Sequence, residues 1–172
     1  DYLSRRKYNI PEIKRSNIAG VILNMINIKI GDIENFPFLE PPDKRAIKDG
    51  FDQLLELGAI NSKKRLTSVG KKMVRLPLEP HISRMIVQAH KENAQKEIIV
   101  ISAGLSIGDP RERPDEKEEE AKKIHKQFNV SGSDFLTLLR LWETYQNQWK
   151  SLKTQNKMRR FCRDHFLSYS RM

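Results

Sequence analysis

Two adjacent prolines, Pro41 and Pro42, constrain the fold of this chain more than any other feature, because they separate two helical patterns. Proline cannot continue a helix, and Asp43 directly after the pair can accept hydrogen bonds from the free N–H groups of a new first helical turn. Apolar residues then recur at the spacing of one helical face, at Ile47, Phe51, Leu54 and Leu55. We therefore expect a helix from Asp43 that ends near Gly58, since glycine readily takes the left-handed conformation that follows many helices.

A short hairpin and a second helix are predicted directly after this one. Residues 59–60 and 65–66 flank a polar tip, Asn61-Ser62-Lys63-Lys64, of the kind that closes a β-hairpin. Thr67 can cap the next helix, whose buried stripe we expect at Val69, Met73 and Leu76. A helix, a small hairpin and a capped helix in this order are typical of a winged-helix module.

The sequence predicts three parts. Residues 1–11 are polar and basic and read as a connector, and the absence of an initial methionine suggests a fragment of a larger protein. Residues 12–76 form the winged helix, which opens with an amphipathic helix from Glu12, and Gly31 ends this helix or the short turn after it. Two prolines, Pro77 and Pro80, then mark the boundary to a helical bundle over residues 77–172.

The bundle shows several helical patterns, so the fold as a whole is expected to be mainly α with one small hairpin. Residues 98–105 are apolar almost all round, which predicts a central, buried helix. Residues 115–128 predict a charged helix with a narrow apolar stripe at Ala121, Ile124 and Phe128. Ser133 can cap the next helix, whose expected core stripe is Phe135, Leu138, Trp142, Tyr145 and Trp149. The rings of Trp142, Tyr145 and Trp149 could instead stack on nucleic-acid bases.

The charge of the chain points to a polyanionic partner. Its 172 residues carry a net charge of +10, which favours nucleic acid over a membrane surface. No apolar run approaches the roughly 20 residues that a membrane-spanning helix needs. The single cysteine, Cys162, excludes an internal disulfide and favours an intracellular protein, so we expect the cytoplasm and no membrane partner.

The sequence contains none of the motifs that carry catalysis. It has no phosphate-binding or dinucleotide-binding glycine loop, no nucleophile elbow and no cluster with metal-ligand spacing. The four histidines are scattered singly, and the acidic run from Glu116 to Glu120 has Lys117, Lys122 and Lys123 alongside it, as a solvated helix face does. We expect no catalytic residue, no metal and no cofactor in this chain.

Basic residues give the candidate binding sites. One cluster lies on the predicted wing and the helix after it, and comprises Lys63, Lys64, Arg65, Lys71, Lys72 and Arg75. A second lies near the C-terminus, and comprises Lys150, Lys153, Lys157, Arg159, Arg160 and Arg163. Each could neutralise several phosphates without reading sequence, or could simply be a solubilising surface.

The loop from Asp109 to Pro114 is the third basic feature. Two prolines bracket Arg111 and Arg113, and a stiff segment that presents guanidinium groups suits phosphate recognition. The same arginines could equally pin the loop to acidic neighbours. We select Arg111 and Arg113 as the first candidate contacts to nucleic acid, and Lys63, Lys64 and Arg65 of the wing as weaker ones.

Several blocks, in order along the chain, carry a resemblance to a known family. They read PEIKRSNIA from Pro11, FPFLEPP from Phe36, LGAI from Leu57 with LTSVG from Leu66, LPLEP from Leu76, AGLSI from Ala103 with DPRERP from Asp109, and SDFL from Ser133. Together they resemble the C-terminal helicase-associated region of DEAH-box RNA helicases, with the last blocks closer to the bacterial members.

The resemblance implies a winged helix followed by a ratchet-like helical bundle. In that family the two domains sit on two RecA-like motor domains of the same polypeptide and complete a channel for single-stranded RNA. ATP and Mg²⁺ bind the motor domains, so this chain is expected to guide the strand and to hydrolyse nothing by itself. The parent protein is expected to be an ATP-dependent RNA helicase.

Two other functions stay open at the level of sequence. The first is a winged-helix DNA-binding regulator with a helical dimerisation domain, which predicts a preference for duplex DNA. The second is a protein-interaction scaffold whose basic clusters dock an acidic partner, which predicts no affinity for nucleic acid at moderate salt.

Overall fold

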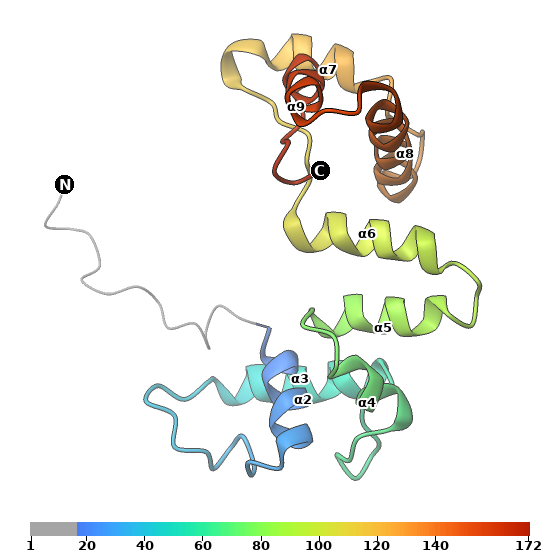
Figure 1. Ribbon diagram of the computed structural model, residues 1–172. Coiled ribbons are helices and arrows are strands. Elements are labelled where there is room, and N and C mark those ends of the chain that lie inside the picture. The colour runs from blue at the N-terminus through green and yellow to red at the C-terminus, as the bar shows by residue number, and fades with distance from the viewer. Residues whose placement is uncertain (1–16) are drawn as a thin grey trace, which may run out of the picture. The chain divides into compact units, whose positions relative to one another are not determined.

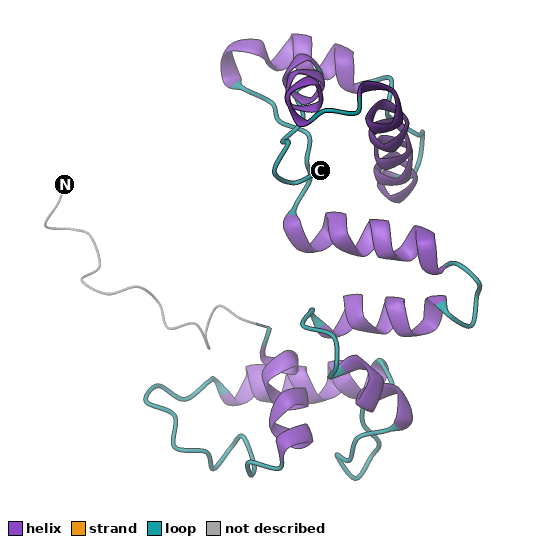
Figure 2. Cartoon of the chain, in the orientation of Figure 1, coloured by secondary structure: helices purple, strands orange, loops and turns teal. Residues whose placement is uncertain are grey.

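The computed structural model describes residues 17–172, and the chain divides after Gln88 into two compact units (Figure 1). The first holds α2 (Ile18–Ile28), α3 (Lys44–Glu56), α4 (Ser68–Met73) and all but the last residue of α5 (Pro80–Ala89). The second holds α6 (Gln95–Ile107), the short 3-10 helix η2 (Asp115–Lys117), α7 (Glu118–His125), α8 (Asp134–Leu152) and α9 (Gln155–Asp164). The predicted mainly helical fold is confirmed (Figure 2).

Helix α2 begins later than the amphipathic helix predicted from Glu12. Asn17 has extended backbone angles, and its side chain accepts a hydrogen bond from the N–H of Ala19 at 3.0 Å, so it caps a helix that begins at Ile18. The helix ends at Ile28, because Lys29 takes a left-handed conformation with φ 55° and its N–H closes on the carbonyl of Met25. A short turn thus lies between the helix and Gly31, which is one of the two endings that the sequence allowed. The predicted connector, residues 1–11, and residues 12–16 lie outside the described part of the chain.

The capping predictions for α3 and α4 are confirmed. Asp43 accepts from the N–H of Arg45 at 2.8 Å, and Gly58 follows α3 with φ 65°. Thr67 accepts from the N–H of Gly70 at 3.0 Å, which starts α4. A β-carbon on Gly70 would lie 2.0 Å from the carbonyl oxygen of Ala59, so α4 can approach the hairpin this closely only with glycine here.

The predicted hairpin is present as a very short one. Ile60 and Leu66 form an isolated antiparallel bridge, and Asn61 donates its N–H to the carbonyl of Arg65 at 2.9 Å. The N–H of Thr67 continues the pairing to the carbonyl of Ala59 at 3.0 Å. The wing therefore rests on few backbone bonds between its two sides, and the burial of Ile60 in the core adds to them.

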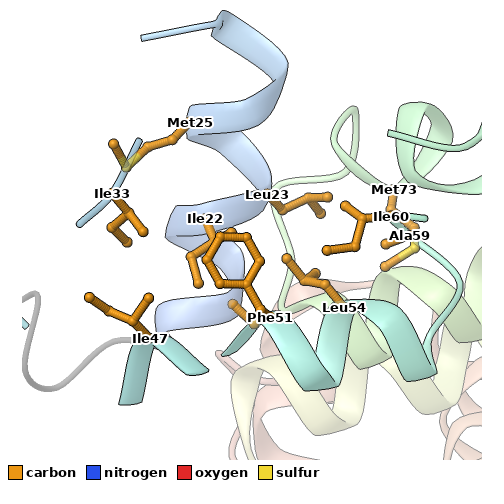
Figure 3. Packing of buried hydrophobic residues seen from close by; sticks show 11 residues of the cluster. Ile22, Leu23, Met25, Ile33, Ile47, Phe51, Leu54, Ala59, Ile60 and Met73 are labelled. Atoms are coloured by element: carbon orange, nitrogen blue, oxygen red, sulfur yellow. The ribbon is translucent and has the colours of Figure 1, made fainter. Parts of the chain in front are cut away.

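The core of the first unit lies between α2, α3 and the hairpin (Figure 3). Its buried apolar side chains are Ala19, Ile22, Leu23, Met25, Ile33, Ile47, Phe51, Leu54, Ala59, Ile60 and Met73. Leu55, predicted to share the buried face of α3, is 40% exposed because the adjacent Leu54 takes the core position. Arg84 donates from Nε to the carbonyl of Leu57 at 3.0 Å, which ties α5 to the end of α3.

The second unit has its own core, formed by Phe128, Leu141, Cys162 and Leu167. The prediction that residues 98–105 form a buried central helix is wrong for most of α6. Ile101 and Ser102 are buried, whereas Ile99, Leu105 and Ile107 are 57%, 43% and 50% exposed. The reason is that α6 packs on α8 along one side, where Gly104 meets Leu138, and its apolar residues extend all the way round.

The predicted core stripe of α8 is displaced around the helix. Ser133 caps the helix as predicted, accepting from the N–H of Leu136 at 3.2 Å. The buried positions are Thr137 and Leu141, whereas Phe135 and Trp149 are 47% and 41% exposed. The charged helix predicted at 115–128 is a 3-10 turn followed by α7, and Ala121 and Phe128 are buried as expected.

The domain limits predicted from the sequence, 12–76 and 77–172, stay predictions. The division of the chain after Gln88 separates two compact units, and such units need not coincide with domains.

Across residues 17–172, no helix is both long and apolar enough to cross a membrane.

Candidate nucleic-acid interface

The arginine-bearing loop 109–114 is fastened to the C-terminal segment of the chain. Glu112 donates its N–H to the carbonyl of Phe166 at 2.8 Å, and Ser168 donates to the carbonyl of Pro110 at 2.7 Å. Arg111 and Leu167 form an antiparallel bridge between these bonds. The loop that follows α6 is therefore held on both sides of Arg111 by a segment more than 50 residues further along the sequence.

The guanidinium of Arg111 is committed to this loop. It donates from Nη2 to Oδ2 of Asp109 at 2.7 Å and from Nε to both carboxylate oxygens at 3.0 Å. Its Nη1 reaches Oδ1 of Asn129 at 3.2 Å. The Arg111 side chain is only 9% exposed, against 44% for that of Asp109. Arg111 therefore pins the loop to an acidic neighbour, which was one of the two interpretations that the sequence allowed.

Electrostatics at this pair follow from the contacts. Burial alone would raise the pKa of Asp109, but the hydrogen bonds from Arg111 outweigh it and hold the pKa of this carboxyl below its ordinary value. The hydrogen bond to Asp109 raises the pKa of Arg111 further above its already high value. Both groups are thus charged at neutral pH, and the pair is a bidentate ion pair.

Arg113, two residues on, differs from Arg111. It is exposed, and its positive charge lowers the pKa of both Asp109 and Glu118 through space, as a smaller influence than the direct partners of those carboxyls. Of the two predicted contacts in this loop, Arg113 is the one whose guanidinium faces solvent.

A buried histidine that the sequence did not single out supports the same segment. His125 is 3% exposed, and its Nε2 lies 3.0 Å from the carbonyl oxygen of Phe166. A carbonyl can only accept, so Nε2 carries the proton, and Nδ1 has no hydrogen-bonding partner among residues 17–172. Its helical spacing from Ala121 and Phe128, four residues after one and three before the other, is the signal that could have predicted its burial.

The wing presents the other three candidate residues. The side-chain oxygen of Asn61 accepts from the N–H groups of Lys63 and Arg65, both at 3.0 Å, which fixes the shape of the tip. Lys64 has a positive φ of 54°, and its Nζ lies 4.0 Å from the centre of the Phe51 ring, so it anchors the wing to α3. The side chains of Lys63 and Arg65 are exposed.

The structure thus brings Lys63, Lys64 and Arg65 together on the wing, and Arg111 and Arg113 together on the loop. The first group belongs to the first unit and the second group to the second unit.

The exposed side of α3 bears on the DNA-binding alternative. In a winged-helix regulator this helix would enter the major groove of duplex DNA. Its exposed residues mix both signs, namely Lys44, Arg45, Lys48, Asp49, Asp52 and Glu56. Three carboxylates on the face that would meet phosphates oppose duplex binding by repulsion.

Burial raises the pKa of the Cys162 thiol to about 11, so it is protonated near neutral pH and a poor nucleophile. In residues 17–172, no three side chains of the types that bind metal ions gather at one place.

Two family models match the chain, and together they cover most of it. The helicase-associated domain (HA2), winged-helix, matches residues 52–78, and the helicase-associated domain (HA2), ratchet-like, matches residues 79–170. The two matches follow one another in the order predicted from the sequence.

Three curated proteins show the same similarity over longer stretches. The chain is 42% identical over 177 residues to the ATP-dependent RNA helicase HrpA of Escherichia coli (strain K12), and 41% identical over 179 residues to the HrpA homolog of Haemophilus influenzae. Each alignment covers 100% of this chain and 14% of the relative. It is 32% identical over 158 residues to the pre-mRNA-splicing factor ATP-dependent RNA helicase prp22 of Schizosaccharomyces pombe, which covers 92% of this chain and 13% of that protein. The chain therefore spans about a seventh of the length of the relatives it matches.

Proposed function

Because the chain belongs to the helicase-associated (HA2) region of the DEAH-box RNA helicases, we propose that it guides single-stranded RNA as an accessory part of such an enzyme. The observation that carries the proposal is the 42% identity to an ATP-dependent RNA helicase along the entire chain. The exposed cations of the wing and of the loop 109–114 supply the chemistry for contacts to a phosphate backbone.

The activity of the whole protein is the second element of the proposal. The relatives are named as ATP-dependent RNA helicases, and this chain corresponds to 14% of the two bacterial ones. Hydrolysis of ATP with Mg²⁺ is assigned to RecA-like motor domains elsewhere in the parent polypeptide, which acts in the cytoplasm. The chain itself docks on those domains and couples the position of the strand to their closure.

The five candidate residues take different roles in this proposal. Arg113, Lys63 and Arg65 are proposed to contact phosphate oxygens of the strand, and the exposure of their side chains supports this role. Arg111 positions the loop through Asp109 and keeps Arg113 in place. Lys64 adds charge to the wing while its ammonium group rests on Phe51.

The test is fluorescence anisotropy of the chain with labelled single-stranded RNA over a range of salt concentrations. Wild-type affinity should fall linearly with salt on logarithmic axes, since neutralising phosphates releases counterions. Arg113→Ala, and separately Lys63→Ala with Arg65→Ala, should weaken binding and flatten the slope by about 0.7 for each phosphate that the variant no longer neutralises.

Lys48→Ala is the matched control for the same measurement. Lys48 is an exposed lysine of α3, outside the wing cluster and the loop, so its removal should leave the slope of the salt dependence unchanged. A slope that is the same in wild type and in all variants would remove these cations from the proposed strand path.

A further inference from the structure

One face of α8 carries aromatic rings that do not enter the core. Together with the C-terminal segment, it forms an open hollow of about 530 Å³ in the second unit, within the range of roughly 300 to 1,000 Å³ typical of ligand sites. The hollow is lined by Trp142, Tyr145, Gln146, Trp149, Lys150 and Tyr169. Five of these come from α8 at the spacing of one helical face, so the helix itself aligns them.

The aromatic side chains of the hollow are held in place by packing contacts. Tyr145 and Tyr169 pack against the core of Phe128, Leu141, Cys162 and Leu167. The ring of Trp142 stacks on that of Tyr145 with centroids 5.8 Å apart and an interplanar angle of 15°. Trp149 stands at the edge with 41% of its surface exposed. The walls of the hollow are therefore pre-ordered, which reduces the loss of entropy when a flat ligand stacks there.

The charged side chain that lines the hollow and the one that lies against its Tyr169 are both basic. Lys150 lines it, and the guanidinium of Arg159 lies 5.2 Å from the ring of Tyr169. These two belong to the C-terminal basic cluster, Lys150, Lys153, Lys157, Arg159, Arg160 and Arg163, and residues 150–163 contain no acidic residue. Aromatic faces beside a run of cations match a ligand that has flat bases and a phosphate backbone. A partner protein with a purely apolar surface would offer these cations no opposite charge.

We propose that this hollow stacks bases of single-stranded RNA, with Trp149 and Tyr169 as the ring faces and Lys150 and Arg159 beside the phosphates. The inference rests on the proposed function and adds to it a second contact, which acts on bases rather than on the backbone. Stacking tolerates any base, so the site adds affinity without sequence preference.

The chain contains two tryptophans, and both line the hollow. Intrinsic tryptophan fluorescence therefore reports on this site directly. The probe is an unlabelled oligouridylate added to the full chain, with anisotropy of the same oligonucleotide in labelled form as an independent measure of total binding. Bound uracil bases should quench the tryptophan emission, and the quenching should saturate at the concentrations at which the anisotropy saturates.

Substitutions of Trp149 separate stacking from simple apolar contact. Trp149→Leu keeps an apolar side chain but removes the ring, and should weaken binding at least about fivefold. Trp149→Phe keeps a ring and should retain most of the affinity. Phe135→Leu is the matched control, since Phe135 is an aromatic residue of α8 that is 47% exposed and lies outside the hollow. It should bind as wild type does.

The outcomes are distinguishable. Binding by anisotropy without quenching, with Trp149→Leu equal to wild type, would overturn the stacking site and leave the proposed strand guidance by cations intact. No binding by anisotropy even at low salt would overturn both. A Trp149→Leu protein that binds RNA normally but has a reduced affinity for the motor domains of the parent would overturn the stacking site too, and would show that the hollow is a protein-docking face.

Discussion

Replacing Arg111 by lysine separates a positioning role for this residue from a direct contact to RNA. Lysine keeps the positive charge in the loop, so a general electrostatic attraction to phosphates is preserved. It lacks the planar fork that lets Arg111 bond both carboxylate oxygens of Asp109 and also reach Asn129. The substitution therefore tests the geometry of the loop and leaves its net charge unchanged.

The magnitude follows from the hydrogen bonds that lysine cannot form. Three donor groups of the guanidinium are bonded, namely Nε, Nη1 and Nη2. A lysine ammonium can replace one of them at Asp109, so the bonds of about two donor groups disappear. A hydrogen bond to a charged group contributes roughly 1.5 to 3 kcal/mol. The Asp109 side chain is 44% exposed, so solvent screening reduces this value. We expect Arg111→Lys to lower the free energy of unfolding of the second unit by about 2 kcal/mol in total.

The assay is urea unfolding followed by tryptophan emission. Trp142 and Trp149 both lie on α8, so the signal reports the second unit and not the first. With a urea m-value of roughly 1 to 3 kcal/mol per M, the midpoint should fall by about 1 M. Arg113→Lys is the matched control in the same loop, and because Arg113 is exposed its free energy of unfolding should change by less than about 0.5 kcal/mol.

Two results would refute this reasoning. An Arg111→Lys midpoint equal to that of wild type would mean that the hydrogen bonds lost with the guanidinium contribute nothing to the fold. Unchanged stability together with a large drop in affinity for single-stranded RNA would mean that Arg111 contacts the strand itself.

Three further predictions concern other parts of the chain. Gly70→Ala should destabilise the first unit by about 2 to 3 kcal/mol, because its β-carbon would lie 2.0 Å from the carbonyl oxygen of Ala59. Hydrogen exchange of the amides of α3 and α4 measures this loss of stability. Gly20→Ala, whose β-carbon would lie at an ordinary van der Waals distance from Pro80, should keep wild-type protection. The Cys162 thiol, with its pKa raised to about 11 by burial, should react slowly with a thiol reagent at about pH 8 and quickly in urea; fast reaction of the folded chain would contradict the burial. The pKa of Asp109 is lowered in the folded state, so its pair stabilises the fold above the ordinary aspartate value of roughly 4, and this contribution is lost as the pH falls through the lowered pKa. Asp109→Asn should accordingly be less stable than wild type at neutral pH, and the difference in urea midpoint should shrink below about pH 4.

Features of the fold that depend on neighbours in sequence could be predicted from the sequence. Asp43, Thr67 and Ser133 each cap a helix, because a side-chain oxygen needs only the next turn of backbone as its partner. Gly58 ends α3 for the same local reason. The predicted start of α2 was wrong because apolar spacing alone does not reveal that Asn17 has extended backbone angles and caps the helix.

Features that depend on which helix lies against which could not be predicted. The apolar run of α6 indicated burial all round, yet only the side toward α8 is covered within the second unit. On α8 several faces carry apolar residues, so periodicity could not decide that Thr137 and Leu141 would be buried and Trp149 exposed. Tertiary packing determines which face of α8 is buried.

The candidate site likewise combines contacts that the local sequence could predict with contacts that depend on tertiary packing. Asp109 lies two residues from Arg111, so the pair was among the alternatives that the sequence left open. Other hydrogen bonds join segments that are distant in sequence, and no local sequence pattern predicts them. They run from Arg111 to Asn129 and from Glu112 and His125 to Phe166. The aromatic hollow likewise needs Tyr169 from beyond α9 to complete it.

The measurement that tests the central claim most directly is anisotropy of the wild-type chain with single-stranded RNA and with duplex DNA, at low and at near-physiological salt. A strand-guiding region should prefer the single strand, show little dependence on base sequence, and bind much more weakly as salt rises. A preference for duplex DNA would contradict the account and support a winged-helix regulator. No binding to either nucleic acid at low salt would contradict it as well, and would assign the basic surfaces to a protein partner.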